Sequence, residues 1–194
     1  MFLSAALGLA ALASPVAAQF VPPAKPKNVI IIVADDVGCP NLRCSTALPG
    51  IPTPNINAIA ARGVTLNATS TGPVCDPSRV SLLLGQYSQR PPTSIWRNPP
   101  RHTTFFPIPT QLTTIAEAMR LKGYATAAIG KYAVMKEKQY LPLQNGYDEF
   151  YGFLTNGQNY FNSNVWRGNK PIGKEKIHLT KAFEREAVSF IHRN

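Results

Sequence analysis

Two adjacent carboxylates are the first residues of this sequence whose type and spacing could bind a metal ion. Asp35 and Asp36 directly follow the apolar run of residues 28–34. Neighbouring carboxylates repel each other, so a bound cation favours the pair, and hard oxygen ligands of this kind suit Ca²⁺ or Mg²⁺. A solvated turn in which one Asp caps the following element explains the pair equally well. The pair alone leaves both interpretations open.

The sequence Cys75-Asp76-Pro77-Ser78-Arg79 is the second candidate. Asp76 is a good helix N-cap, and Pro77 suits the first helical position. Cys75 is therefore expected at a helix N-terminus, where free N–H groups and the helix dipole favour an anion. Arg79 adds a positive charge one turn further along. A nucleophilic thiol with a lowered pKa and a buried structural cysteine are both compatible with this pattern.

The elements that must position these residues alternate between strands and helices. Residues 28–34 form a continuous β-branched run, typical of a strand buried on both faces of a parallel sheet, and residues 124–129 predict another that reaches Lys131. Helical spacing and end signals predict helices over residues 54–62, 77–84, 114–122 and 179–193. Residues 86–110 and 140–177 are expected to be loops. This alternation indicates an α/β fold with a mostly parallel central sheet flanked by helices.

The N-terminal residues 1–18 are typical of a secretory signal peptide. A short uncharged run of Leu and Ala is followed by small residues at Val16 and Ala18, which fits cleavage after Ala18. The run is shorter than the ~20 apolar residues that span a bilayer. Residues 19–27 are then a linker, and residues 28–194 form the domain. We expect a secreted or periplasmic protein with no membrane contact once the signal is cleaved.

The amino-acid composition indicates which kind of molecule the protein binds. The net charge of +10 comes from 20 Lys+Arg against 10 Asp+Glu and indicates an anionic partner. The basic residues are spread along the chain without a long run, so no nucleic-acid partner is expected. The 44% of apolar residues excludes a wholly disordered chain. Cys39 and Cys44 are close enough in sequence for a disulfide, and free thiols fit them equally well.

The segment 75–79 resembles the C-x-P-S-R sequence of type I sulfatases, arylsulfatase-like enzymes of the alkaline-phosphatase-like superfamily whose cysteine is oxidised to formylglycine before folding. Residues 28–38 resemble the family's opening strand with its Asp-Asp metal ligands. Residues 123–131 resemble the stretch that carries its sulfate-binding lysine. Two further segments are similar, residues 53–63 and 145–153. The resemblance covers residues 28–194 and implies the N-terminal part of a sulfatase catalytic domain, so we expect the fold to be incomplete.

This resemblance implies a role for each matching residue. Asp35, Asp36 and the modified Cys75 would hold a calcium ion, with Mg²⁺ as the less favoured metal. The hydrated aldehyde at position 75 would attack sulfur through one hydroxyl, and its second hydroxyl would help to expel sulfate. Arg79 would orient that group, and Lys131 would pair with the sulfate oxygens. The implied partners are a small-molecule or glycan sulfate ester and, during maturation, the formylglycine-generating enzyme.

Departures from the family pattern define the alternatives. Ala133 stands where the family usually has a histidine, and the family's second active-site histidine, Asp/Asn metal pair and second lysine come later than the position matching Asn194. The histidines match no catalytic position and are expected on the surface or in loops: His102, His178 and His192. The main hypothesis is a formylglycine-dependent sulfuric ester hydrolase. The alternatives are a catalytically inactive truncated sulfatase-like fragment and a phosphate or phosphonate ester hydrolase of the same fold.

Overall fold

The computed structural model describes residues 28–37, 52–66, 69–88, 90, 108, 111–134 and 138–194. The chain divides into two compact units, Met1–Val37 and Gly38–Asn194. Each unit is described by itself. Several predictions fall outside the described residues: the signal peptide, the linker, the cysteines at 39 and 44, most of the proline-rich loop, and His102.

The first unit contributes residues 28–37, which form neither helix nor strand. Its aliphatic side chains are exposed, from 50% for Val33 to 80% for Ile32. The prediction of a strand buried on both faces is therefore wrong for this unit as the structure describes it. A strand requires backbone hydrogen bonds to a neighbour. A run of apolar residues favours burial, but it does not determine which other strand will pair with it.

The second unit is built on a four-stranded sheet in the order β1-β2-β3-β4. The strands are β1 (Ala127–Lys131), β2 (Glu149–Phe153), β3 (Ser163–Arg167) and β4 (Lys170–Glu175). Strands β1 and β2 pair in parallel, whereas β2 with β3 and β3 with β4 pair antiparallel. The α/β class is confirmed, and among the described strands the sheet is mixed.

The loop predicted over residues 140–177 is wrong, because β2, β3 and β4 lie within it. Strands β3 and β4 are joined by the two-residue turn Gly168-Asn169, and every residue of β4 except Glu175 is exposed. A two-residue connection is typical of a hairpin. Strand β4 therefore lacks the apolar alternation that marks a half-buried strand.

Four α-helices accompany the sheet in the described part of the chain: α1 (Pro54–Arg62), α2 (Cys75–Leu84), α3 (Ile115–Leu121) and α4 (Leu179–Arg193). Two short 3-10 helices, η2 (Lys138–Tyr140) and η3 (Pro142–Asn145), precede β2. The predicted bounds of α1 and α4 are confirmed, and α2 begins two residues earlier than predicted. None of the described helices combines the length and the apolar character needed to cross a membrane.

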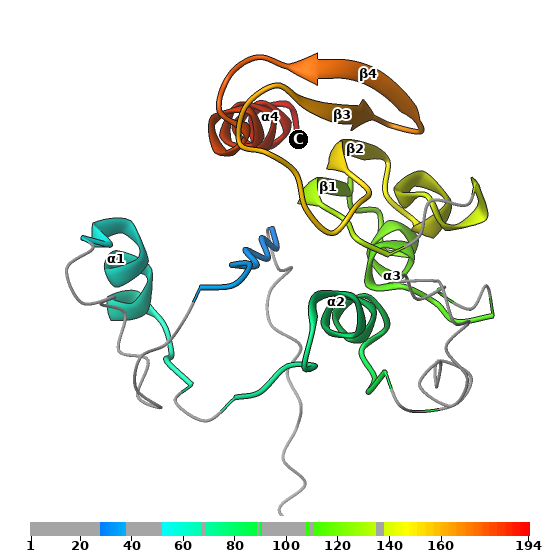
Figure 1. Ribbon diagram of the computed structural model, residues 1–194. Coiled ribbons are helices and arrows are strands. Elements are labelled where there is room, and N and C mark those ends of the chain that lie inside the picture. Colours follow the sequence, from blue (N-terminus) through cyan, green and yellow to red (C-terminus); the bar gives the residue numbers. More distant parts are fainter. Residues whose placement is uncertain are drawn as a thin grey trace, which may run out of the picture. The chain divides into compact units, whose positions relative to one another are not determined.

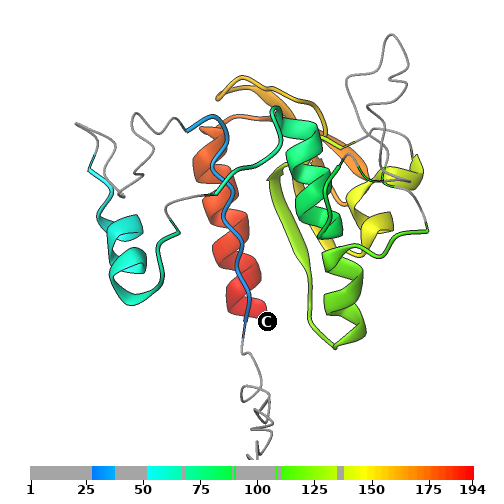
Figure 2. The same cartoon turned by 90° about the horizontal axis from the view of Figure 1, so that it is seen from below.

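Helices lie on both sides of strands β1 and β2 of the sheet (Figures 1 and 2), whereas β4 is exposed. Successive side chains of β2 point to opposite faces. Phe150 joins the core that contains Val80 of α2, whereas Tyr151 and Phe153 join the core that contains Ala182 of α4. Helices α2 and α4 therefore lie on opposite sides of β2.

Helix α4 buries only part of the apolar side that its sequence presents. The sequence places Phe183, Ala187, Val188 and Ile191 on one apolar side. In the structure Ala182 is fully buried and Phe183 packs beside it, while Val188 is 46% and Ile191 51% exposed. The fully buried contact with the sheet lies in the first turns of the helix, and polar contacts extend it to the last turn, where Arg193 Nη2 lies 2.7 Å from Glu149 Oε2 of β2.

Helix α3 begins with the capping box that the sequence predicts. Thr114 Oγ1 accepts a hydrogen bond from Glu117 N at 3.1 Å, and Glu117 Oε2 accepts one from Thr114 N at 2.7 Å. The same Thr114 hydroxyl donates to Asn145 O at 2.7 Å. The cap therefore also fixes α3 against η3.

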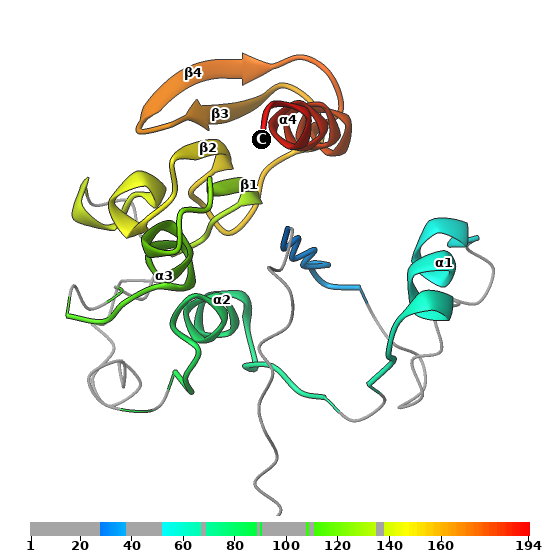
Figure 3. The same cartoon turned by 180° about the vertical axis from the view of Figure 1, so that it is seen from behind.

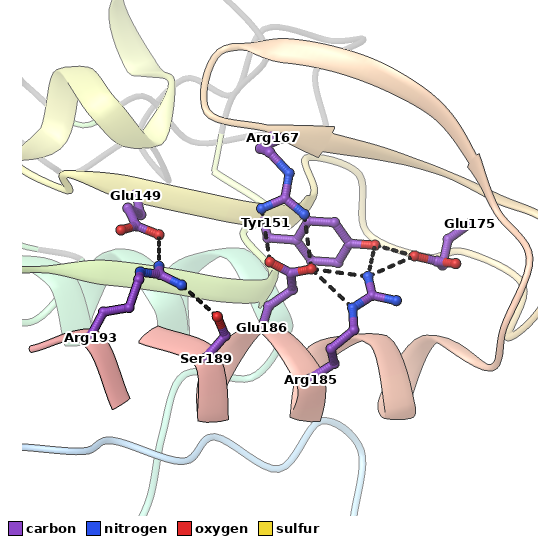
Figure 4. Close-up of polar contacts among 8 residues, drawn as sticks. All are labelled: Glu149, Tyr151, Arg167, Glu175, Arg185, Glu186, Ser189 and Arg193. Carbon is purple, nitrogen blue, oxygen red and sulfur yellow. Dashed lines mark hydrogen bonds and ion pairs between the residues drawn. The ribbon is translucent and has the colours of Figure 1, made fainter. Parts of the chain in front are cut away.

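Helix α4 lies beside the hairpin of β3 and β4 (Figure 3), and a polar network joins the two (Figure 4). The Tyr151 hydroxyl donates to Glu175 Oε2 at 2.5 Å, and Arg185 Nη2 lies 3.1 Å from the same oxygen. Arg167 donates to both carboxylate oxygens of Glu186 at 2.8 Å. The Tyr151 hydrogen bond, together with Arg185, lowers the pKa of Glu175 to about 2. Burial, with the neighbouring Glu175, raises the pKa of Tyr151 to about 12.

Candidate active site

Cys75 is the first residue of α2, following Val74 as the N-cap in an extended conformation. The prediction that Asp76 caps this helix is wrong, because Asp76 lies inside its first turn. No side chain caps the helix in the described structure. The Ser78 hydroxyl instead contacts the carbonyl oxygens of Val74 at 2.9 Å and Gly72 at 3.0 Å, as donor to each. Proline is tolerated throughout the first turn, where N–H groups have no partner within the helix, so Pro77 marks that turn and not its first residue.

Lys131 is the last residue of β1 and is aligned with Phe153 of β2. The pairing continues one residue beyond it, since Tyr132 N donates to Phe153 O at 2.9 Å. Beside it the two strands approach closely: a Cβ atom on Gly152 would lie 1.8 Å from the carbonyl oxygen of Gly130. The absence of a side chain at Gly152 is thus required for the strand pair that holds Lys131.

The structure brings three of the predicted site residues together in the second unit. Lys131 Nζ donates to Cys75 Sγ at 3.1 Å, and Arg79 Nη1 donates to Lys131 O at 2.5 Å. Cys75 and Arg79 are four residues apart on α2 and so share one face of it. All three residues are half-buried. One positive side chain, Lys131, therefore lies beside a sulfur atom at the start of a helix, and a second, Arg79, binds the backbone of that lysine, an arrangement suited to an anion.

Asp76 is buried beside Cys75 and contacts a distant loop, which the sequence did not indicate. It is only 4% exposed, and its Oδ1 has no hydrogen-bond partner in the described structure. Its Oδ2 accepts a long hydrogen bond of 3.4 Å from Asn156 Nδ2. Burial raises the pKa of Asp76, whereas Asn156, Lys131 and Arg79 act in the opposite direction. Asn156 is 80 positions away in sequence, so only folding could reveal this contact.

Asp35 and Asp36 belong to the other compact unit. Both are exposed there, and Asp36 has a φ angle of 55°, in the left-handed region. Residues other than glycine adopt this region rarely, and Asp and Asn do so more readily than most. Their part in a metal site with position 75 stays a prediction.

The histidine position of the family pattern has an unusual backbone here. Ala133 is fully buried and has a φ angle of 47°. Of the described histidines, His192 is exposed, in agreement with the prediction. His178 is the N-cap of α4, where its Nδ1 accepts a hydrogen bond from Thr180 N at 3.2 Å.

A hollow of about 310 Å³ lies elsewhere in the second unit. It is lined by residues of β1 and β2, by Arg167 of β3 and by Glu186 of α4. Cys75, Arg79 and Lys131 do not line it. The charged cluster at Cys75 is therefore the stronger candidate for chemistry.

Comparison with known proteins assigns the family. Residues 27–194 match the family model described as Sulfatase. The chain is 35% identical over 136 residues to Arylsulfatase H of Canis lupus familiaris, covering 64% of this chain and 24% of that protein. It is 27% identical over 193 residues to N-acetylgalactosamine-6-sulfatase of Homo sapiens, covering 87% of this chain and 37% of that protein.

Among solved structures, the crystal structure of Ps i-CgsB superposes with a TM-score of 0.55 at 29% identity, covering 62% of this chain and 31% of that one. The chain thus spans between about a quarter and two fifths of the length of the curated relatives named above. The family model covers most of the chain and includes every residue of the candidate site. The chain belongs to the sulfatase family.

Proposed function

We propose that the protein of which this chain forms part or all hydrolyses organic sulfate esters at position 75. The observation that carries the proposal is the contact of 3.1 Å between Lys131 Nζ and Cys75 Sγ, with Arg79 bound to the same lysine's carbonyl. A nucleophile at this position has the ammonium group of Lys131 beside it, and Arg79 follows one helical turn later. Membership of the sulfatase family supports the same reaction.

The charges of the site fit a sulfate ester. Negative charge is spread over the sulfate oxygens and builds up on the leaving oxygen as the S–O bond breaks. Fixed positive groups that face this charge lower the barrier. In this proposal Lys131 would pair with sulfate oxygens, and Arg79, which donates to the carbonyl oxygen of Lys131, would hold the lysine beside the first turn of α2. When formed from Cys75 by the formylglycine-generating enzyme, formylglycine supplies a hydrated aldehyde as the nucleophile.

Asp35, Asp36 and an oxygen of the modified residue 75 are proposed as ligands of a calcium ion, with Mg²⁺ as the alternative. The donor set fits a hard cation, because it consists of two carboxylates and a hydroxyl oxygen. A metal held there supplies Lewis-acid polarisation of a sulfate oxygen. The exposed carboxylates of residues 35 and 36 are accessible to an ion.

The substrate class proposed is a sulfated glycan or a small sulfate ester. One relative is named an N-acetylgalactosamine-6-sulfatase, and Ps i-CgsB was also crystallised in complex with k-i-k-neocarrahexaose. The signal-like residues 1–18 support a secreted or periplasmic location, the exported compartment in which such glycans occur.

The test uses the protein from its complete gene, produced together with the formylglycine-generating enzyme. We expect hydrolysis of a chromogenic aryl sulfate by the wild type, and loss of it in both Cys75→Ala and Cys75→Ser. Mass spectrometry of the peptide containing residue 75 should find formylglycine, which is lighter than cysteine. Thermal unfolding checks that both variants are folded.

Three results would contradict the proposal. Full activity of Cys75→Ala would exclude position 75 as the nucleophile. Faster hydrolysis of an aryl phosphate or phosphonate than of the sulfate would favour the phosphatase-like alternative. Absence of turnover in a wild type that carries formylglycine would favour a catalytically inactive protein.

A further inference from the structure

The loop between β2 and β3, residues 154–162, runs from the candidate site to the start of α4. Near its beginning Asn156 donates to Asp76, the neighbour of Cys75. At its end the carbonyl oxygen of Tyr160 accepts a hydrogen bond of 2.8 Å from Leu179 N. The Ser163 hydroxyl donates to Asn159 O and closes the last turn of the loop. The backbone of this 154–162 loop is therefore anchored at both ends.

The 154–162 loop carries two aromatic rings that are held in place yet exposed. The Tyr160 ring stacks on His178 with centroids 5.0 Å apart and planes at 15°, and Phe161 meets the same histidine edge-on at 5.0 Å. Tyr160 is nevertheless 67% exposed and Phe161 56%. One face of Tyr160 is covered by His178, so its exposed area includes the opposite face. Rings held in this way lose little conformational entropy when they bind a ligand.

The residues around these rings have the chemistry of sugar recognition. The exposed part of the loop is rich in amides that donate to and accept from hydroxyl groups: Asn156, Gln158, Asn159 and Asn162. Lys174, Lys176 and Lys181 are exposed and lie within four residues of His178 in sequence. A pyranose has an apolar C–H face surrounded by hydroxyls, and sulfate groups add negative charge. Aromatic faces, amides and lysines complement these three features in turn.

The distance between Asn156 and Tyr160 is also compatible with a bound oligosaccharide. Tyr160 lies four positions after Asn156 in the sequence, so the Cα atoms of the two residues are at most ~14 Å apart. A short oligosaccharide covers that distance. A sugar chain with one unit near Asn156 and Asp76 can therefore extend to the rings at the other end of the same loop.

We propose that the 154–162 loop is a glycan-binding loop, in which Tyr160 and Phe161 stack on a sugar unit next to the one whose sulfate lies at Cys75. The inference rests on the proposed function for the identity of the sulfate-bearing unit. It adds a binding subsite outside the group of Cys75, Arg79 and Lys131. It also commits the surface to a carbohydrate and not to another protein.

The test measures binding without turnover, because every protein is produced without the formylglycine-generating enzyme and keeps Cys75 unmodified. Fluorescently labelled hexasaccharides of chondroitin 6-sulfate and of κ-carrageenan are titrated with the wild type, Tyr160→Ala, Tyr160→Phe and Phe161→Ala. For the tighter-binding sugar we expect the two alanine variants to raise Kd by about three- to tenfold, the range of one aromatic stack. Tyr160→Phe keeps the ring and should stay within about twofold of the wild type. Tyr87→Ala removes a tyrosine that is 70% exposed on the segment after α2, and should leave Kd unchanged.

The inference is overturned if the wild type binds neither hexasaccharide or if Tyr160→Ala binds as tightly as the wild type. It is also overturned if Tyr160→Phe loses as much affinity as Tyr160→Ala, since stacking would then not be the cause. Sedimentation equilibrium provides one more outcome: a wild-type dimer that Tyr160→Ala converts to a monomer would make the surface a self-association site. Loss of affinity in the alanine variants without any aryl sulfate hydrolysis would overturn the proposed function and retain this inference. Hydrolysis of the aryl sulfate by the wild type, together with an unchanged Kd in the alanine variants, would overturn this inference and retain the proposed function.

Discussion

Lys131 Nζ lies 3.1 Å from Cys75 Sγ although 56 positions separate the two residues in sequence. The contact arises because the last residue of β1 meets the first turn of α2. The guanidinium of Arg79, on that helix, donates to the carbonyl oxygen of Lys131 and ties the helix to the end of the strand. The placement of the lysine therefore depends on the β1–β2 pair as well as on the helix.

Lys131→Met should reduce kcat/KM for an aryl sulfate by about 10²- to 10³-fold, the usual cost of losing one group that stabilises transition-state charge. Methionine keeps the length of the side chain and removes its charge. The measurement is steady-state hydrolysis by the formylglycine-containing protein. Lys122→Met, at the exposed end of α3, is the matched control and should retain activity. Equal activity of the two variants would show that Lys131 does not act on the substrate.

Gly152→Ala should destabilise the second unit by at least ~2 kcal/mol, because overpacking of a close contact costs this much even where neighbours can move. The new Cβ atom would overlap the carbonyl oxygen of Gly130, a backbone atom that cannot move without breaking the strand pair. Urea unfolding followed by circular dichroism measures the loss. Gly157→Ala is the control, since a Cβ atom there would meet nothing within 4 Å. Similar midpoints for both variants would contradict the close approach of β1 and β2.

Thr114→Ala should lower the free energy of unfolding by about 1–2 kcal/mol, the cost of removing an N-cap side chain. The substitution also removes the hydroxyl that donates to Asn145 O. The neighbouring Thr113 is exposed, so Thr113→Ala makes a matched control for the loss of a threonine. If both substitutions cost the same, the capping box does not stabilise α3.

Glu175 should make the stability of the second unit depend on pH in the acid range. Its pKa in the folded protein is lowered to about 2 by the Tyr151 hydroxyl and Arg185, so the folded state holds the carboxylate more firmly than the unfolded state does. This contribution is present above the ordinary glutamate pKa and is lost as the pH falls toward 2. Glu175→Gln should therefore show a shallower decline of the unfolding free energy below pH ~4.5.

Tyr151→Phe should act in the same direction, since it removes the hydroxyl that contributes most to the low pKa of Glu175. Glu184→Gln changes an exposed glutamate on the same helix as Arg185 and serves as the control. An acid profile of Glu175→Gln identical to that of the wild type would mean that the network of Figure 4 does not stabilise the fold.

Elements with strong local signals were predictable from the sequence. Helix α1 begins with a proline and ends at Gly63, α3 carries a reciprocal capping box, and α4 is a long amphipathic run. These signals operate within a few residues, so they survive without knowledge of the fold. The hairpin of β3 and β4 has no such signal, because its outer strand is exposed and lacks apolar alternation.

In the candidate site, too, some residues were predictable from the local sequence and others were not. Cys75 at a helix start and Arg79 one turn later follow from local helix geometry, whatever the rest of the chain does. Asp76 was misassigned as a cap because its burial and its contact with Asn156 are invisible to any local pattern. The 154–162 loop, predicted only as loop, was not recognised as part of the site for the same reason.

The sequence by itself determined the residue types, the helices and the family pattern that places a cysteine, an arginine and a lysine in one order along the chain. Only the tertiary structure decided which of these meet: Lys131 with Cys75, Arg79 with the carbonyl of Lys131, and Asn156 with Asp76. The physical reason is range. Caps, turns and amphipathic periodicity act over a few residues, whereas strand pairing and burial depend on segments far apart in sequence, whose choice of partner the local chain does not encode.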